Sequence, residues 1–296
     1  MTHPMIDADD PLVADLLAGT IELVREAGGF IAPTTRLVER AGQLSIESSA
    51  VAGEPLLRIP REAFVRVDRV EWSQDGDRIV IEQVPDDCGA LEWEMLYLQV
   101  ALHNACGKLA WMRRTHPSLD PGLPEDLVDA VRAVVPSFRT PQMGAIDLLW
   151  ANRCFRLPME PGSEPERVLI PIVDLLNHDA DGATGDWDAE SFQVATAPAF
   201  GTSECALDYG MERDAMEMAV VYGFAGSSRA ASSTSDYDLE SLGRLIELAS
   251  QPGARESAQP LHQAATLLAL ALDDPPLHAR DSRGGVVDAP ANDDLG

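Results

Sequence analysis

Residues 168–182 read VLIPIVDLLNHDADG, an apolar run that is followed at once by polar side chains. The first six residues have the composition of a buried strand. Asp174, Asn177 and His178 come directly after it, and polar groups at the end of a buried strand need hydrogen-bond partners. Taken alone, the Asn-His pair fits either a satisfied turn or a ligand site. This stretch is therefore the leading candidate for a functional site.

The patterns that could bind a metal are weak. Asp174 and His178 are four residues apart and would form a pair only on a helix. In the acidic run DADGATGDWDAE, residues 179–190, glycine is not at the sixth position of a calcium loop counted from Asp179. The four cysteines lie far apart and lack the spacing of a zinc site. We therefore expect a solvated acidic loop at 179–190 and no metal.

Composition limits the classes of partner. The chain has 296 residues, about two domains or one with a large insertion. Its net charge of −27 would repel nucleic acid and anionic membranes, so neither is an expected partner. Lys108 is the only lysine. The acidic surface could attract a basic substrate, or it could reflect a salty habitat or a base-composition bias, and both interpretations stay open.

The expected location is the cytoplasm. The start of the chain, MTHPMIDADD, has neither a basic nor an apolar signal region, and no stretch reaches 18 uncharged apolar residues. We therefore expect a soluble protein with reduced cysteines.

Periodicity predicts a β-rich block after an N-terminal helix. The helix spans 10–27, with Asp10 as N-cap and Pro11 at its first position, and two glycines end it. Strands are expected at QLSIES, PLLRIP and RIVIEQ, which are residues 43–48, 55–60 and 78–83.

The rest of the chain alternates between helices and strands. Helical periodicity covers 90–112, 124–135 and 140–155, strands are expected at 168–173, 191–196 and 204–209, and a helix follows at 213–224. A linker, AASSTS at 230–235, precedes two further helices at 239–248 and 261–272 and a mobile tail.

At this point the sequence resembles a known family. PIVDLLNHD, residues 171–179, resembles the P-x-x-D-x-x-N-H signature of SET-domain methyltransferases, in the branch of the Rubisco large-subunit lysine methyltransferase and the actin-histidine methyltransferase. AGQLSIESSAVAGEPLLRIPREAFV at 41–65 resembles the first SET motif, and WANRCF at 150–155 resembles the x-S-R-x-F helix end. LDYGMERDAMEMAVVYGF at 207–224 resembles the segment that ends in Tyr-Gly-Phe. The four matches occur in the family's order over roughly residues 28–226.

The resemblance implies an α+β protein with a β-rich, pseudo-knotted SET fold, a helical insertion and a short helical C-terminal lobe. The implied segments are an N-terminal helix with the first SET part at 1–85, the insertion at 86–150, the second SET part at 151–226, the C-terminal lobe at 227–275 and the tail at 276–296.

It also implies an S-adenosylmethionine-dependent N-methyltransferase that acts on an amine, with a protein lysine as the expected acceptor. Cofactor and amine are expected to bind on opposite faces, and the sequence does not predict the oligomeric state. The residues that the resemblance places at the cofactor are Gly42, Gln43, Leu44, Arg153, Asn177, His178 and Tyr222.

Tyr222 and Tyr209 correspond to the two tyrosines of the catalytic site, whereas Asp174 is expected to support the fold by bonding backbone N–H groups. Methyl transfer from a sulfonium needs an aligned, neutral amine and the exclusion of water. A phenol, with an ordinary pKa of about 10, can hydrogen-bond the amine without consuming its lone pair.

Two departures from the family keep alternatives open. About 70 residues follow Gly226, fewer than the family's substrate-binding domain has, so a histidine or a small-molecule amine is an alternative acceptor. Asp214 and Ala215 replace the family's Ser-Asn, and Asp179 replaces the serine after Asn-His. A SET-like binding module without turnover is therefore a second alternative.

Overall fold

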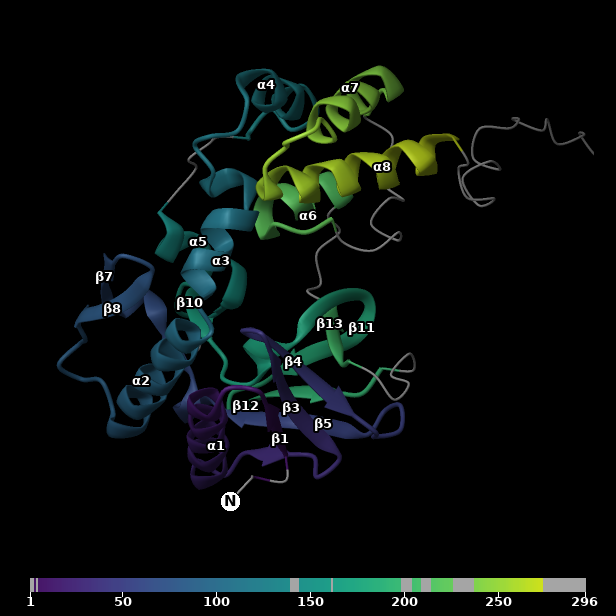
Figure 1. Ribbon diagram of the computed structural model, residues 1–296. Coiled ribbons are helices and arrows are strands. Elements are labelled where there is room, and N and C mark those ends of the chain that lie inside the picture. The colour runs from purple at the N-terminus through teal and green to yellow at the C-terminus, as the bar shows by residue number, and fades with distance from the viewer. Residues whose placement is uncertain are drawn as a thin grey trace, which may run out of the picture.

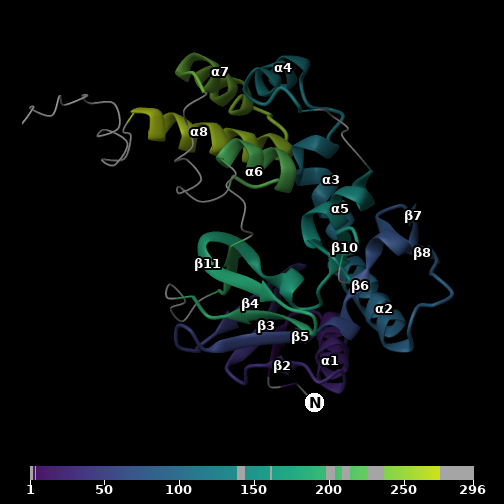
Figure 2. The same cartoon turned by 180° about the vertical axis from the view of Figure 1, so that it is seen from behind.

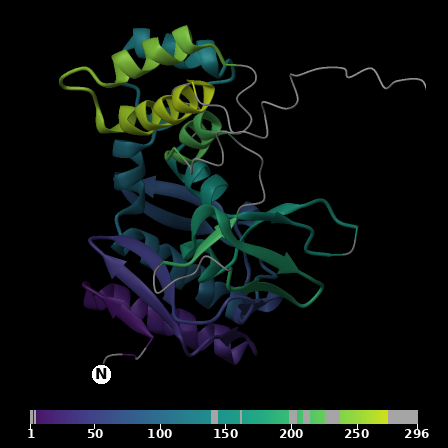
Figure 3. The ribbon, with the colours of Figure 1, turned by 90° about the vertical axis from the view of Figure 1, so that its right-hand side faces the viewer.

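The computed structural model describes residues 3, 5–138, 144–160, 162–197, 204–208, 214–225 and 237–273. Helices and small β-sheets are mixed along the chain, which confirms the predicted α+β class. Most of the strands lie in the lower half of Figure 1, beneath a group of helices, and Figure 3 shows these two parts from the side.

Four small sheets contain the described strands. The largest has the strand order β13-β11-β12-β5-β2, and the others are β1-β3-β4, β6-β10-β9 and the hairpin β7-β8. The predicted strands at 43–48, 55–60 and 78–83 are confirmed as β4, β5 and β8. The strands are β1 (Ile6–Ala8), β2 (Phe30–Ile31), β3 (Thr35–Arg40), β4 (Gln43–Ser48), β5 (Pro55–Pro60), β6 (Val65–Arg66), β7 (Glu71–Asp75), β8 (Arg78–Gln83), β9 (Phe155–Leu157), β10 (Glu166–Leu169), β11 (Asn177–Trp187), β12 (Ser191–Ala195) and β13 (Ala206–Asp208).

The helices begin and end at the expected signals, with one exception. Asp10 caps α1 by accepting a hydrogen bond from the Leu12 N–H at 2.8 Å, as predicted. The single helix expected over 90–112 is two helices, because Gly107 takes a φ of 59° between α2 and α3. α1 and α2 pack side by side (Figures 1 and 2). The helices are α1 (Pro11–Glu26), α2 (Ala90–Ala105), α3 (Lys108–Thr115), α4 (Glu125–Val134), α5 (Ala145–Arg153), α6 (Ala215–Tyr222), α7 (Leu239–Ala249) and α8 (Gln259–Asp273).

The structure corrects the prediction of an acidic loop at 179–190. Residues Asn177–Trp187 form β11, which pairs with β12 and β13, so partner strands satisfy the backbone of this polar segment. Gly185 makes one of these pairings possible, since a Cβ there would lie 2.2 Å from the Phe192 ring. Sequence polarity alone does not reveal such a partner.

The strand expected at 168–173 is shorter than predicted. β10 ends at Leu169, Pro171 follows, and Ile172 adopts a φ of 71°, which is unusual for a β-branched residue. The chain then makes a 3-10 turn at Val173–Leu175 that holds Asp174. This sharp change of direction separates the apolar run from the polar residues of the candidate site.

Two hydrophobic cores stabilise the fold. The first lies among the sheets and helices α1, α2, α3 and α5. The second is built by α4, α6, α7 and α8, which come from three of the predicted segments. The domain boundaries stay a prediction. The predicted linker at 230–235 and the tail at 276–296 lie outside the described residues, and no described helix has the length and apolarity to cross a membrane.

Candidate functional site

A cavity of about 260 Å³ brings together five of the predicted site residues, which are Gln43, Arg153, Asn177, His178 and Tyr222. They arrive from β4, α5, β11 and α6, elements far apart in the sequence. We call it the Lys108 cavity. Its walls are made by Gln43, Lys108, Trp111, Met112, Leu149, Asn152, Arg153, Asn177, His178, Tyr222 and Phe224.

Gln43 reaches this cavity from a tight turn between β3 and β4. Ala41 and Gly42 have φ values of 50° and 79°, positive at both central positions as in a type I′ hairpin turn. A Cβ at Gly42 would lie 2.8 Å from the carbonyl oxygen of Cys106, so glycine is required here for close approach as well. The Gly42 N–H donates to the buried Glu39 carboxylate at 2.5 Å. The turn is thus fixed against the end of α2.

Asn177 and His178 open β11 and connect the cavity wall to α6. The Asn177 side-chain amide donates a hydrogen bond to the Glu204 carboxylate. The rings of His178 and Phe224 have centroids 6.1 Å apart, and those of Phe224 and Tyr222 are 6.0 Å apart. Three rings therefore follow one another along this wall.

Arg153 ends α5 and faces the same cavity. Its Nη1 donates to the backbone carbonyl oxygen of Asp174 at 2.9 Å, which ties the end of the helix to the 3-10 turn. Lys108, the first residue of α3, lines the cavity beside it. Both charged residues of the lining are cations, although the chain carries a net charge of −27.

The end of α6, and with it Tyr222, is held by two side chains from another segment. His116 Nε2 donates to the Val221 carbonyl oxygen at 3.0 Å, and the Ser118 hydroxyl donates to that of Val220 at 2.9 Å. Burial lowers the pKa of His116 to about 4, so this imidazole is neutral at pH 7. The last carbonyls of the helix, which lack intrahelical donors, are satisfied in this way.

A second cavity, of about 680 Å³, meets the first. It is lined by residues of α5, β9 and the 3-10 turn, including Asp174, and we call it the Asp174 cavity. Asn152, Arg153 and Tyr222 line both cavities. The buried Asn152 Oδ1 has no hydrogen-bond partner among the described residues. An unsatisfied acceptor at this junction is suited to a donor on a bound molecule.

Asp174 and His103 form a buried pair behind the junction. Asp174 Oδ2 lies 3.6 Å from His103 Nε2. The backbone N–H groups of Ile172 and Asp174 also act on this carboxyl and lower its pKa, in line with the expected role in supporting the fold. Burial raises the pKa of Asp174 to about 7 and lowers that of His103 to about 3. Because burial disfavours both charged forms, we do not regard this contact as a salt bridge.

Three predicted residues are not among the described residues that line the cavity. Gly42 lies in the turn next to Gln43 but is not part of the wall. The side chain of Leu44 lies in the first hydrophobic core. Neighbouring residues of a strand point to opposite faces, so Leu44 and Gln43 cannot both face the cavity. Tyr209 lies outside the described residues.

Other lining residues were not predicted. Lys108 had a signal, as the only lysine in the chain, and Phe224 belongs to the Tyr-Gly-Phe motif. Trp111 and Asn152 had none, because their helical stretches contain other polar and aromatic residues with the same local pattern.

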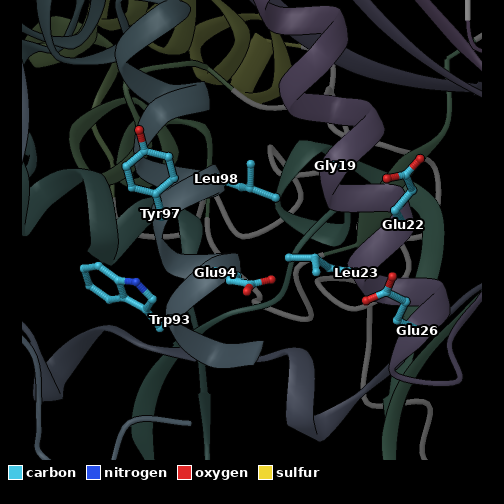
Figure 4. Close-up of a pocket in the computed structure, with 8 residues that line it drawn as sticks. All are labelled: Gly19, Glu22, Leu23, Glu26, Trp93, Glu94, Tyr97 and Leu98. Carbon is cyan, nitrogen blue, oxygen red and sulfur yellow. The ribbon is translucent and has the colours of Figure 1, made fainter. Parts of the chain in front are cut away.

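A groove between α1 and α2 is a different kind of surface. Trp93 and Tyr97 line it together with three glutamates, and Figure 4 shows Leu23 and Leu98 between the two helices. Its carboxylates give it the opposite charge to the Lys108 cavity. No group of three or more potential metal ligands occurs in the described ranges, and all four cysteines are free thiols.

Comparisons with known proteins find similar solved structures, which include the following two. One is the SET domain of LSMT bound to lysine and AdoHcy, at 16% identity and a TM-score of 0.39, covering 73% of this chain and 58% of the other. The second is Rubisco LSMT bound to sinefungin and monomethyllysine, at 16% identity and a TM-score of 0.42, covering 73% and 56%.

No protein-family model matches the chain, and no curated protein matches its sequence. The chain spans less than two-thirds of the length of each structural neighbour. Since both TM-scores lie below 0.5, we base the proposed function on the chain's own residues and motifs.

Proposed function

We propose that the protein is an S-adenosylmethionine-dependent N-methyltransferase. The observation that carries this proposal is the meeting of two cavities at Tyr222, Arg153 and Asn152. Transfer of a methyl group requires a donor and an acceptor that approach a common point from opposite sides. Two cavities with one shared wall provide this geometry, and the shared wall contains the tyrosine of the Tyr-Gly-Phe motif.

In this proposal the Lys108 cavity binds the cofactor, which supplies an electrophilic methyl group. Asn177, His178 and the turn at Gly42 and Gln43 hold it, and Arg153 lies near its carboxylate. The acceptor amine enters through the Asp174 cavity.

Tyr222 would orient the amine by a hydrogen bond, and Asn152 Oδ1 offers a second acceptor for an amine N–H. The surrounding rings of His178 and Phe224 would exclude water from the reacting atoms.

The residues that depart from the family have local structural roles. Asp214 is the N-cap of α6: it accepts a hydrogen bond from the Glu217 N–H at 2.8 Å and another from the Tyr237 hydroxyl. Asp179 accepts one from the Asp181 N–H at 2.8 Å. These contacts give Asp214 and Asp179 local structural roles. We favour an enzyme over a binding module without turnover because the two cavities still meet at Tyr222.

The acceptor we propose is a lysine of a protein, because a chain with a net charge of −27 attracts basic partners. A pseudo-knotted SET topology, a C-terminal lobe with a role in substrate binding and a cytoplasmic location complete the proposal.

The test is incubation with methyl-labelled S-adenosylmethionine and a mixture of lysine-rich proteins, beside the same mixture with its lysines chemically blocked. We expect label in the first mixture only. Label that persists after blocking would point to histidine, label in small molecules alone would point to a free amine, and no label in any fraction would contradict the proposal.

A further inference from the structure

Lys108 is buried at a position that is unfavourable for a cation. It is only 3% exposed and is the first residue of α3, where the helix dipole presents its positive end. A second cation, Arg153, lines the same cavity. Lysine is almost never buried without compensation, because removing an ammonium group from water is costly.

The contacts described for Lys108 compensate only part of this cost. Its Nζ donates to Gln43 Oε1 at 3.3 Å and lies 5.9 Å from the centroid of the Trp111 ring. An ammonium group has three donors, and Gln43 is a neutral acceptor. Two donors are therefore left for a group that binds in the cavity.

The titratable groups around Lys108 do not supply a full negative charge to balance its ammonium group. They are Arg153, Cys106, Asp174 and Glu39. The Glu39 carboxylate already accepts three backbone N–H bonds, at the turn and at the start of α1. Burial raises the pKa of Cys106 to about 11 and that of Asp174 to about 7, which weakens both as counter-charges at neutral pH.

We propose that Lys108 binds the carboxylate of the methionine part of S-adenosylmethionine, together with Arg153. This inference rests on the proposed function and deepens it by assigning a residue that recognises one group of the cofactor. A carboxylate matches two cations that line one cavity and the positive end of a helix dipole. It also explains why the single lysine of the chain lies at this cavity.

The test compares S-adenosylmethionine with its decarboxylated analogue by calorimetric titration of the full chain and of Lys108→Met. Loss of a charge-assisted hydrogen bond should weaken S-adenosylmethionine binding by about 10- to 100-fold. Binding of the decarboxylated analogue should change little. An equal loss for both ligands, or no loss for either, would overturn the inference. Failure of the unmodified protein to bind either ligand would overturn the proposed function, and the inference with it.

Arg113→Met is the matched control, since Arg113 lies on the same helix but is exposed and paired with Asp77 at 2.7 Å. It should leave both affinities unchanged. Lys108→Met should also unfold at the same temperature as the unmodified protein or higher, because it removes a buried charge. A marked loss of stability would assign Lys108 a structural role instead.

The pH dependence gives an independent readout on the unmodified protein. Burial lowers the pKa of Lys108 to about 8, and only the protonated form attracts a carboxylate. The preference for S-adenosylmethionine over the decarboxylated analogue should therefore fall as pH rises through about 8, and this part of the fall should be absent in Lys108→Met. Identical pH profiles for the two proteins would contradict the assignment.

Discussion

Among single side chains, Tyr222 is the one on which the proposed reaction depends most directly. It lines both cavities and continues the row of rings from His178 and Phe224. Tyr222→Phe keeps the ring but removes the hydroxyl that would orient the amine. We expect the rate of methyl transfer to fall by about 100-fold or more, because a small misalignment of the reactants has an effect of this size. The affinity for the cofactor should change little. Parallel losses of rate and cofactor binding would show that the hydroxyl acts on the cofactor instead.

Asp174 predicts a pH dependence of stability. Its folded pKa of about 7 is above the ordinary 3.8, so the folded protein binds more protons than the unfolded chain in this window. Its contribution to stability is therefore lost as pH rises from about 4 to about 7. His103, with its pKa lowered to about 3, acts in the opposite direction but is present in both the unmodified protein and an Asp174 variant.

Asp174→Asn removes this titration, so chemical unfolding of both proteins at several pH values measures it. The variant should gain in stability relative to the unmodified protein as pH rises from about 4 to about 7. A constant difference between the two curves would contradict the raised pKa.

Only some side chains of the candidate site could be predicted from the sequence. Asn177 and His178 were found because a motif spaces them after an apolar run, and both line the cavity. Asn152 and Trp111 were not found, since what distinguishes them is the unsatisfied oxygen of Asn152 and the place of both side chains in the cavity wall. Such properties depend on partners that are distant in the sequence.

Among helices and strands, the end of α6 determines where Tyr222 lies. Gly223 has a φ of 77°, and a Cβ there would meet His116 Cδ2 at 2.8 Å. Gly223→Ala should lower the free energy of unfolding by about 1–2 kcal/mol for the left-handed backbone alone, and should also reduce methyl transfer by displacing Tyr222.

Gly243→Ala is the control for this change, measured by thermal unfolding. Gly243 is exposed inside α7, and among the described residues a Cβ there would contact nothing outside its own helix. Because glycine weakens the interior of a helix, alanine should stabilise the protein here by up to about 1 kcal/mol. If Gly223→Ala were as harmless as Gly243→Ala, the C-cap of α6 would not be a positioning element.

Elements with strong local signals were predicted well, and those defined by a distant partner were not. α1 has its N-cap, its proline and its two glycines in the sequence, and the structure shows the helix at Pro11–Glu26. β11 was expected to be a loop, because its polar residues give no alternation and its stability comes from β12 and β13. The break between α2 and α3 depends on the backbone conformation of Gly107.

Across the whole molecule, the net charge of −27 predicts how salt would affect binding of a charged substrate. A strongly negative protein attracts basic partners by long-range electrostatic forces. Salt screens this attraction, and the Debye length is about 10 Å at 0.1 M ionic strength. Methylation of a lysine peptide with basic flanks should slow as ionic strength rises, mainly through a higher KM. A matched peptide with acidic flanks should show the opposite trend. Equal salt responses for both would assign the acidity to solubility alone.

The central claim is that the Lys108 cavity binds S-adenosylmethionine, and calorimetric titration with S-adenosylmethionine and S-adenosylhomocysteine tests it most directly. The same titration on Asn177→Ala examines the signature residue at the cavity wall. We predict saturable binding of both ligands to the unmodified protein and weaker binding to the variant. Absence of binding to either ligand would contradict the claim.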